Sequence, residues 1–218
     1  ITADPADDRM PSFSPDGRRV AFTSNRAGNW DVYVTSLDDG RPMQITSDPE
    51  SELHPTWSPD GTQLAYCRLG AQSGRWEIWT VDVDNPAIKR FLDYGRLPKW
   101  SPDVASSRIL FQRARRRGSR LFSIWTVDVT ASGEASYPTE IASATNAALI
   151  NPSWSPDGSR IVFAAVVDRE PGLEETPAQA DLWVVDADGV GRTNLATVEA
   201  TSFQPVWAPS GVVYFVSD

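Results

Sequence analysis

A short motif recurs along the chain, and its spacing limits the folds that the chain can form. Complete copies stand at 11–22 (PSFSPDGRRVAF), 55–66 (PTWSPDGTQLAY) and 152–163 (PSWSPDGSRIVF), and eroded copies begin at Pro98 and Pro205. Internal repeats with a period of about 20 to 50 residues are typical of solenoids, propellers and other repeat arrays. The sequence therefore predicts a fold built from one repeated unit of secondary structure.

Each unit has the pattern of four short strands. S-P-D-G separates the first two apolar runs and suits a type I turn, because proline fixes φ at the second turn position and glycine follows. Alternation of apolar and polar residues, as in IWTVDV (78–83) and LWVVDA (182–187), predicts strands. A short apolar segment closes each unit, and no stretch has the pattern of an amphipathic helix. We expect four antiparallel strands joined by tight turns.

Aromatic residues recur at two equivalent positions of the units. The first position holds Phe13, Trp57, Trp100, Trp154 and Trp207, and the second holds Tyr33, Trp79, Trp125 and Trp183. A sheet with two apolar faces cannot bury itself, but sheets stacked face to face around an axis can. The sequence therefore predicts an all-β fold, a β-propeller of four-stranded antiparallel blades, in which these aromatics pack between blades.

The repeat also predicts how far the propeller extends. We expect a single domain over 1–218, with four complete blades at about 11–46, 55–92, 98–142 and 152–196, and partial terminal blades at 1–3 and 205–218. An uncovered blade face of about 330 Å² leaves roughly 8 kcal/mol of hydrophobic stabilisation unrealised. We therefore expect a segment of a six- or seven-bladed ring, which missing blades or a partner chain would close.

Composition excludes several classes of protein. A net charge of −9 disfavours nucleic acid as a partner, and no apolar run is long enough to span a membrane. The first twenty residues do not have the pattern of a signal peptide. His54 is the sole histidine, Cys67 lies within an apolar strand, and no G-x-S-x-G motif is present. We therefore expect no catalytic residue, no zinc site and no cofactor in this chain.

Two acidic segments, 4–8 (DPADD) and 48–52 (DPESE), occupy equivalent connections between blades. Their carboxylates offer the oxygen ligands that Ca²⁺ prefers, which makes Ca²⁺ an alternative to the absence of a cofactor. However, these segments lack the glycine-punctuated spacing of a D-x-D-x-D-G loop. Solvated turns with Asp caps account for their composition.

Two inserted loops, 112–120 and 166–181, lie between the second and third strands of neighbouring blades. Propeller geometry places both on one face, together with the acidic connections. The candidate partner-binding rim consists of Arg113, Arg115, Arg116, Arg117, Arg120, Asp168, Glu170, Glu174 and Glu175. One hypothesis is a protein-docking rim. The alternative is that the two loops pair with each other, at about 0–1 kcal/mol for each exposed pair.

The residues just before each inner strand should surround the propeller axis on the same face. They are Arg9, His54, Leu97, Asn151 and Gln204. The candidate axial mouth consists of the polar members of this set, Arg9, His54, Asn151 and Gln204, because propellers commonly bind ligands or peptides at such a mouth.

The repeated P-x-W-S-P-D-G-x-x-[ILV]-[AV]-[FY], followed by D-[IVL]-[WY]-V-x-D-x-D-G, resembles the TolB-like, WD-related family of β-propeller repeats. The third blade departs from it at Val104, and the last blade departs at Ala208 and Ser210. The resemblance implies six or seven blades, a periplasmic or exported location in bacteria, and a non-enzymatic role. Similar blades also form the propeller domains of prolyl oligopeptidase-like and tricorn-type peptidases, and fold alone does not imply function.

The function that we expect is a non-catalytic binding or scaffold module that engages a protein or peptide through its loop-rich face. The alternative is the substrate-gating propeller of a prolyl oligopeptidase-like or tricorn-type serine peptidase, whose catalytic α/β domain lies outside this chain. A carbohydrate-binding or lyase propeller is less favoured, because the histidine-rich metal site that it needs is missing from the sequence.

Overall fold

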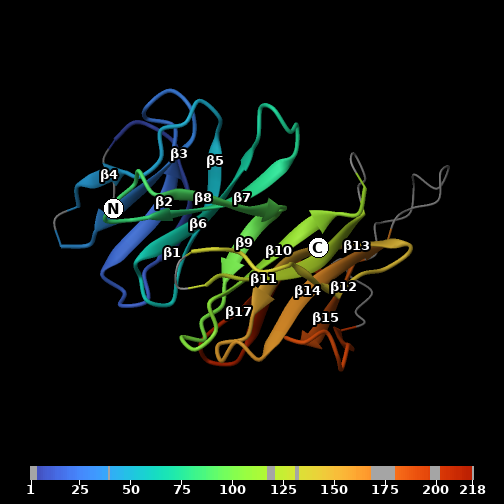
Figure 1. Ribbon diagram of the computed structural model, residues 1–218. Helices are drawn as coiled ribbons and strands as arrows, with labels where there is room; N and C mark the ends of the chain where they lie inside the picture. The colour runs from blue at the N-terminus through green and yellow to red at the C-terminus, as the bar shows by residue number, and fades with distance from the viewer. Residues whose placement is uncertain are drawn as a thin grey trace.

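The computed structural model describes residues 4–38, 40–116, 121–130, 133–167, 180–196 and 202–217 (Figure 1). In these residues all regular structure is β-strand, arranged as four four-stranded sheets and one two-stranded sheet. Every strand pair is antiparallel, and the strand order within each sheet follows the sequence. The repeated motif therefore builds one sheet per repeat.

The strands of the five sheets have the following bounds. The first blade contains β1 (Asp8–Phe13), β2 (Arg19–Ser24), β3 (Asp31–Ser36) and β4 (Pro42–Gln44). The second contains β5 (Glu52–Trp57), β6 (Gln63–Leu69), β7 (Trp76–Asp82) and β8 (Lys89–Tyr94). The third contains β9 (Arg96–Trp100), β10 (Arg108–Ala114), β11 (Phe122–Asp128) and β12 (Thr139–Ala142). The fourth contains β13 (Ala147–Trp154), β14 (Arg160–Val167), β15 (Ala180–Asp186) and β16 (Thr193–Ala196), and β17 (Ser202–Trp207) and β18 (Val213–Ser217) form the last sheet.

Successive sheets pack against one another. The first strand of each blade contacts the preceding sheet: β5 lies against β1 and β2, β9 against β5 and β6, β13 against β10 and β11, and β17 against β13 and β14. In Figure 1 the sheets follow one another around an arc from the N-terminal to the C-terminal blade. This arrangement confirms the predicted all-β fold with propeller blades.

The S-P-D-G segments form the predicted turns. In the second blade the Gly61 N–H donates to the Ser58 carbonyl (2.9 Å), and the Asp60 carboxylate accepts from the Ser58 hydroxyl (2.6 Å). Gly61 has a φ of 71°, a left-handed conformation that favours glycine. In the third blade, Val104 stands where the other blades have this glycine, and a longer turn closes from the Ser106 N–H to the Asp103 carbonyl (3.1 Å).

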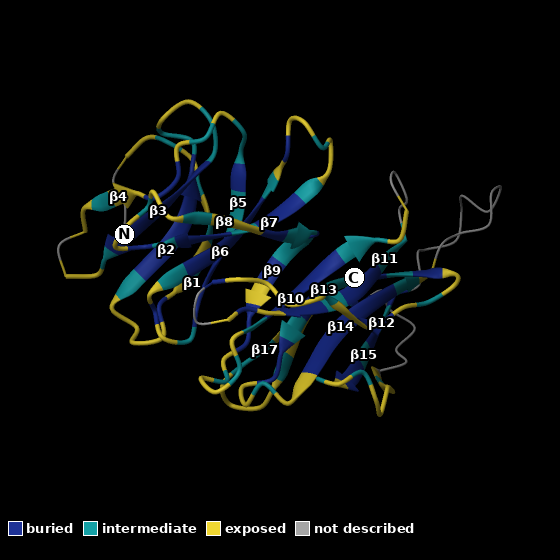
Figure 2. Ribbon diagram, in the orientation of Figure 1, coloured by how far each residue is buried: buried dark blue, intermediate teal, exposed yellow. Residues whose placement is uncertain are grey.

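Two of the motif tryptophans, Trp57 and Trp154, hydrogen-bond to the preceding blade. The Trp57 indole N–H donates to the Ser12 carbonyl of the first blade (3.0 Å), and the Arg19 guanidinium lies 4.6 Å from the centroid of the Trp57 ring. The Trp154 indole makes the equivalent bond to the Lys99 carbonyl (3.0 Å). Buried residues are concentrated along the middle strands of the sheets, shown in dark blue in Figure 2. The core therefore lies between the blades.

Each blade's first strand begins before the motif proline and bulges beside it. The pairing register between the first and second strands shifts at this point in all five sheets. The residue before the proline has a φ between 52° and 59°; these residues are Met10, His54, Leu97, Asn151 and Gln204. Proline has no N–H to donate to the ladder, so it is tolerated at a bulge. The bulge gives every blade the same local geometry at its inner strand.

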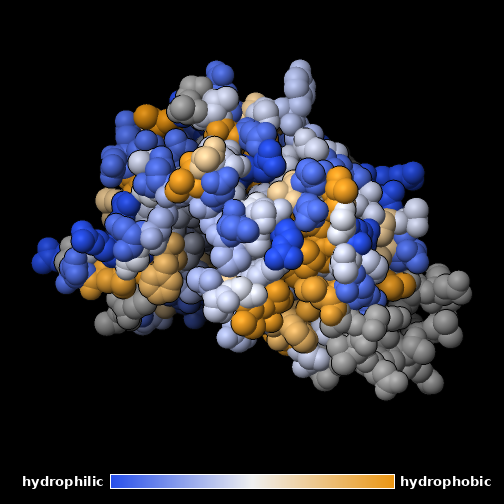
Figure 3. All heavy atoms as spheres, turned by 90° about the horizontal axis from the view of Figure 1, so that it is seen from below, coloured by the Kyte–Doolittle hydropathy of each residue, from blue (hydrophilic) through white to orange (hydrophobic). Residues whose placement is uncertain are grey.

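Apolar side chains are exposed on the first and last sheets of the described chain. Phe13 occupies the position of Trp57, but Phe13 is 60% exposed, whereas Trp57 is 5% exposed. In the last sheet Tyr214 is 63% exposed and Phe215 is 43% exposed. Apolar side chains also reach the surface among polar ones in the view from below (Figure 3). The described residues thus leave the outer faces of the two terminal sheets uncovered.

Candidate functional site

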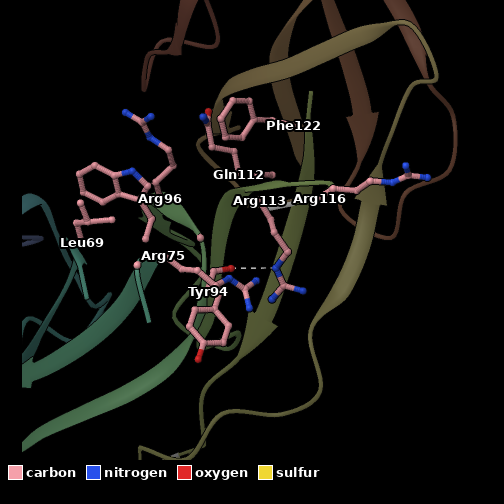
Figure 4. A pocket seen from close by; sticks show the side chains of 12 residues that line it. Leu69, Arg75, Tyr94, Arg96, Gln112, Arg113, Arg116 and Phe122 are labelled. Atoms are coloured by element: carbon pink, nitrogen blue, oxygen red, sulfur yellow. Dashed lines mark hydrogen bonds between the residues drawn. The ribbon is translucent and has the colours of Figure 1, made fainter. Parts of the chain in front are cut away.

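Three connections meet at the seam between the second and third blades and surround a pocket of about 300 Å³ (Figure 4). They are the β6–β7 loop, the short link between β8 and β9, and the β10–β11 loop. The lining includes four arginines and three aromatic residues: Arg75, Arg96, Arg113, Arg116, Trp76, Tyr94 and Phe122. We call this the seam pocket. Its lining contains no acidic residue.

Aromatic rings position two of the arginines. The Arg75 guanidinium carbon lies 3.7 Å from the centroid of the Tyr94 ring, and that of Arg96 lies 5.1 Å from the Trp76 ring. Contacts of this kind stabilise a cation through the quadrupole of the ring. Figure 4 shows Arg75 directed with Tyr94 toward one end of the pocket and Arg96 toward the other. The two cations are therefore separated and held by aromatic faces.

Arg113 has a different role from these two arginines. It forms an ion pair with Asp93, and its Nε donates to the Tyr94 carbonyl (2.9 Å). Its guanidinium also lies 4.4 Å from the centroid of the Trp125 ring. By contrast, in the part of the chain that the structure describes, no carboxylate forms an ion pair with Arg75 or Arg96. The positive charge of the seam pocket therefore comes from arginines other than Arg113.

Arg96 links the seam pocket to the inner strands. Its Nε is buried and has no hydrogen-bond partner among the described residues. Burial, together with the charges of Lys99 and Arg96, lowers the pKa of His54 to about 4. His54 is therefore neutral at pH 7, and the positive potential in this region belongs to Arg96 and Lys99.

The structure describes only part of the predicted rim. Arg115 and Arg116 are exposed in the β10–β11 loop, and Arg115 Nη1 donates to the Ala144 carbonyl (2.6 Å) in the β12–β13 connection. Arg113 is half-buried and paired with Asp93. The remaining rim residues lie outside the described residues: Arg117, Arg120, Asp168, Glu170, Glu174 and Glu175. The contact of Arg115 fixes the loop against the start of the fourth blade.

The predicted axial mouth needs one correction. His54, Asn151 and Gln204 do occupy equivalent positions, because all three precede the motif proline and share the left-handed backbone conformation. In the first blade that position belongs to Met10. Arg9 lies one residue earlier, is exposed, and pairs with Asp7 (3.1 Å). Arg9 was assigned one residue too early: counted back from the motif proline, the residue equivalent to His54 is Met10.

Sequence reasoning missed Arg75, Arg96 and their aromatic partners. Both arginines directly follow a glycine in a connection, in SGRW (73–76) and YGRL (94–97). A Cβ on Gly95 would collide with the ring of Phe111, so close packing requires glycine there. The recurrence of Gly-Arg beside an aromatic residue is the signal that could have identified them.

Two carboxylates of the acidic connection at 48–52 pair with basic residues. Asp48 pairs with Lys89 (2.8 Å) and Arg68 (3.5 Å), and Glu50 also pairs with Arg68 (3.7 Å). Among the described residues, no group of three histidine, cysteine or acidic side chains is placed to hold a metal ion. In the same residues, no helix has the length and apolar character needed to cross a membrane.

Comparison with solved structures shows the same fold. One solved structure, that of a putative TolB from Agrobacterium tumefaciens, superimposes with a TM-score of 0.73 at 23% identity, covering 100% of this chain and 78% of that one. A puromycin-hydrolysing peptidase from Mycobacterium tuberculosis superimposes with a TM-score of 0.65 at 13% identity, covering 91% of this chain and 33% of that one.

The sequence matches are shorter but point to the same family. The Tol-Pal system protein TolB of Bordetella pertussis is 50% identical over 40 residues, which are 18% of this chain and 9% of that protein. The match thus spans less than a tenth of the curated relative. The family model of the TolB beta propeller domain matches residues 2–211. The chain therefore belongs to the TolB β-propeller domain family.

Proposed function

We propose that this chain is a non-catalytic binding or scaffold module that engages a protein or peptide through its loop-rich face. The single observation that carries the proposal is the seam pocket, where arginines without a carboxylate partner and aromatic walls converge. Arginine, tryptophan and tyrosine are the residues most enriched at binding hot spots. The pocket is formed by connections on a rigid scaffold, which is the usual location of binding residues.

The chemistry of the described residues supports a binding role. Cys67 is fully buried, and burial raises the pKa of its thiol to about 12, so the reactive thiolate is not populated at neutral pH. Burial lowers the pKa of His54 to about 4, which makes its imidazole a weak general base at neutral pH. Among the described residues, neither of these two side chains is therefore suited to nucleophilic catalysis.

Location and ring closure form part of the same proposal. By likeness to proteins named for the Tol-Pal system, we propose a periplasmic or otherwise exported location and protein partners. The uncovered apolar faces at Phe13 and Tyr214 support closure of the ring by further blades or by a partner chain.

The second candidate is the propeller domain of a serine peptidase, favoured by the likeness to the puromycin-hydrolysing peptidase. In that case a separate α/β domain with a G-x-S-x-G elbow must supply the catalytic residues. The intact mass of the native protein separates the two. A mass roughly 30 kDa or more above 24.0 kDa leaves room for a hydrolase domain, and a smaller excess favours the binding module.

The docking face is tested by changing the basic loop. We expect the triple variant Arg115→Ala, Arg116→Ala, Arg117→Ala of the full-length protein to lose capture of its partner from a cell-envelope extract. Arg18→Ala is the matched control, because Arg18 is an exposed arginine in the β1–β2 turn, at the opposite end of the strands. Undiminished capture by the triple variant would show that this loop is not the docking rim.

A further inference from the structure

We propose that the seam pocket binds the carboxylate groups of an acidic peptide segment, with one carboxylate on Arg75 and a second on Arg96. This inference rests on the proposed binding function and narrows it to the chemistry of the partner.

Charge is the first reason. The chain carries a net charge of −9, yet the seam pocket is lined by four arginines and no acidic residue. Asp93 neutralises only Arg113. The Nε of the partly exposed Arg96 is buried and has no acceptor among the described residues, which is unfavourable for a cationic group. A carboxylate supplies the acceptor and the opposite charge together.

Geometry is the second reason. The guanidinium planes of Arg75 and Arg96 lie near the rings of Tyr94 and Trp76, so their positions are fixed before a ligand arrives. The planar N–H fork of arginine matches the two oxygens of a carboxylate. A site whose side chains are already ordered loses less entropy on binding. Since Arg75 and Arg96 point toward different ends of the pocket, they suit two separate carboxylates better than a single one.

The apolar walls and the size of the pocket favour a peptide. Trp76, Tyr94 and Phe122 line the pocket together with Leu69, which is half exposed, and they offer contact area to an apolar side chain between two acidic ones. A volume of about 300 Å³ accommodates a few side chains. A nucleic acid would bring a run of phosphates toward a chain of net charge −9, whereas a short acidic segment meets mainly the local arginines.

The experiment measures the affinity of the full-length protein for two defined peptides by titration calorimetry. The probes are Ac-Gly-Glu-Phe-Glu-Gly-NH₂ and its neutral counterpart, Ac-Gly-Gln-Phe-Gln-Gly-NH₂. We expect the glutamate peptide to bind about tenfold or more tightly than the glutamine peptide, and raised salt to reduce that difference. The double variant Arg75→Gln, Arg96→Gln should bind both peptides equally weakly. Arg18→Gln, at the opposite end of the strands, should bind like the unchanged protein.

Three results would overturn the inference. They are equal affinity of the unchanged protein for the two peptides, no measurable binding of the glutamate peptide at millimolar concentration, and tighter binding of the oligonucleotide dT10 than of that peptide. All three results are measured on the unchanged protein, so they do not depend on how the double variant folds. If the triple change in the basic loop abolishes partner capture while the peptides bind equally, the proposed function stands and this inference fails.

Discussion

A buried pair of carboxyl groups between the first two blades makes stability depend on pH. Asp31 at the start of β3 is 1% exposed and Glu52 at the start of β5 is 0% exposed. The Gln44 amide donates to one Asp31 oxygen (3.0 Å), and both Glu52 carboxyl oxygens are buried without a basic partner among the described residues. Burial, together with the charges of Asp48 and Asp31, raises the pKa of Glu52 to about 8. Burial also raises the pKa of Asp31.

The sign of the effect follows from these directions. A carboxyl group whose pKa is higher in the folded state stays protonated there, whereas the unfolded chain releases the proton above pH 4.5, the ordinary value. The contribution of Glu52 to stability is therefore complete below pH 4.5 and is lost progressively as the pH rises to about 8. Each pKa unit corresponds to about 1.4 kcal/mol, so the total loss is at most about 5 kcal/mol. That is comparable with the net stability of a domain.

The variant Glu52→Gln replaces the acid with a neutral amide of similar shape, which can donate to Asp31. We expect Glu52→Gln to match the unchanged protein near pH 5 and to exceed it by a few kcal/mol at pH 8. Urea unfolding of the full-length protein between pH 5 and pH 8, followed by tryptophan fluorescence, measures the difference. Glu140→Gln is the control, because Glu140 is exposed. Parallel stability curves for the unchanged protein and Glu52→Gln, or a less stable variant at pH 8, would refute the reasoning.

Three further predictions concern the blades. Trp57→Phe removes the hydrogen bond to Ser12 and should lower the unfolding free energy by about 1–2 kcal/mol. Trp207→Phe should lower it less, because the Trp207 indole donates within its own hairpin. Equal losses of unfolding free energy in urea would contradict this prediction. Because burial raises the pKa of the Cys67 thiol to about 12, Ellman's reagent should label Cys67 only on unfolding, and rapid labelling of the native protein would be the contrary result. Gly158→Ala should cost about 1–2 kcal/mol, since the φ of Gly158 is 71°; an unchanged urea midpoint would show that this turn tolerates a side chain.

The fold was predictable because its determinants are local and repeated. The S-P-D-G turn, the alternating strands and the motif tryptophans each act within one blade or between adjacent ones, so the same residues recur in the sequence. The bulge before each proline was not predictable, because no residue type marks it. Residues as different as Met10 and Asn151 adopt the same left-handed backbone there, where the first strand pairs with the second. The error at Arg9 has a different origin, because Met10 directly precedes Pro11 in the sequence just as His54 precedes Pro55.

The candidate site was predictable only in part. A dense run of arginines drew attention to the loop at 112–120, but charge density does not show which arginine is neutralised. The partner of Arg113 is Asp93, in the preceding blade, and Arg75 and Arg96 are single residues in two different connections. A pocket formed at a seam depends on how two blades pack, and no single segment of the sequence contains that information.

The partner-binding surface that we propose is the loop-rich face at the seam of the second and third blades. Hydrogen–deuterium exchange of the full-length protein, with and without the captured partner, tests this claim most directly. We expect slower exchange at 70–76, 94–97 and 112–116 in the complex, with unchanged exchange in the opposite turn at 58–61. Protection confined to 58–61 and the equivalent S-P-D-G turns, with none at the seam, would contradict it.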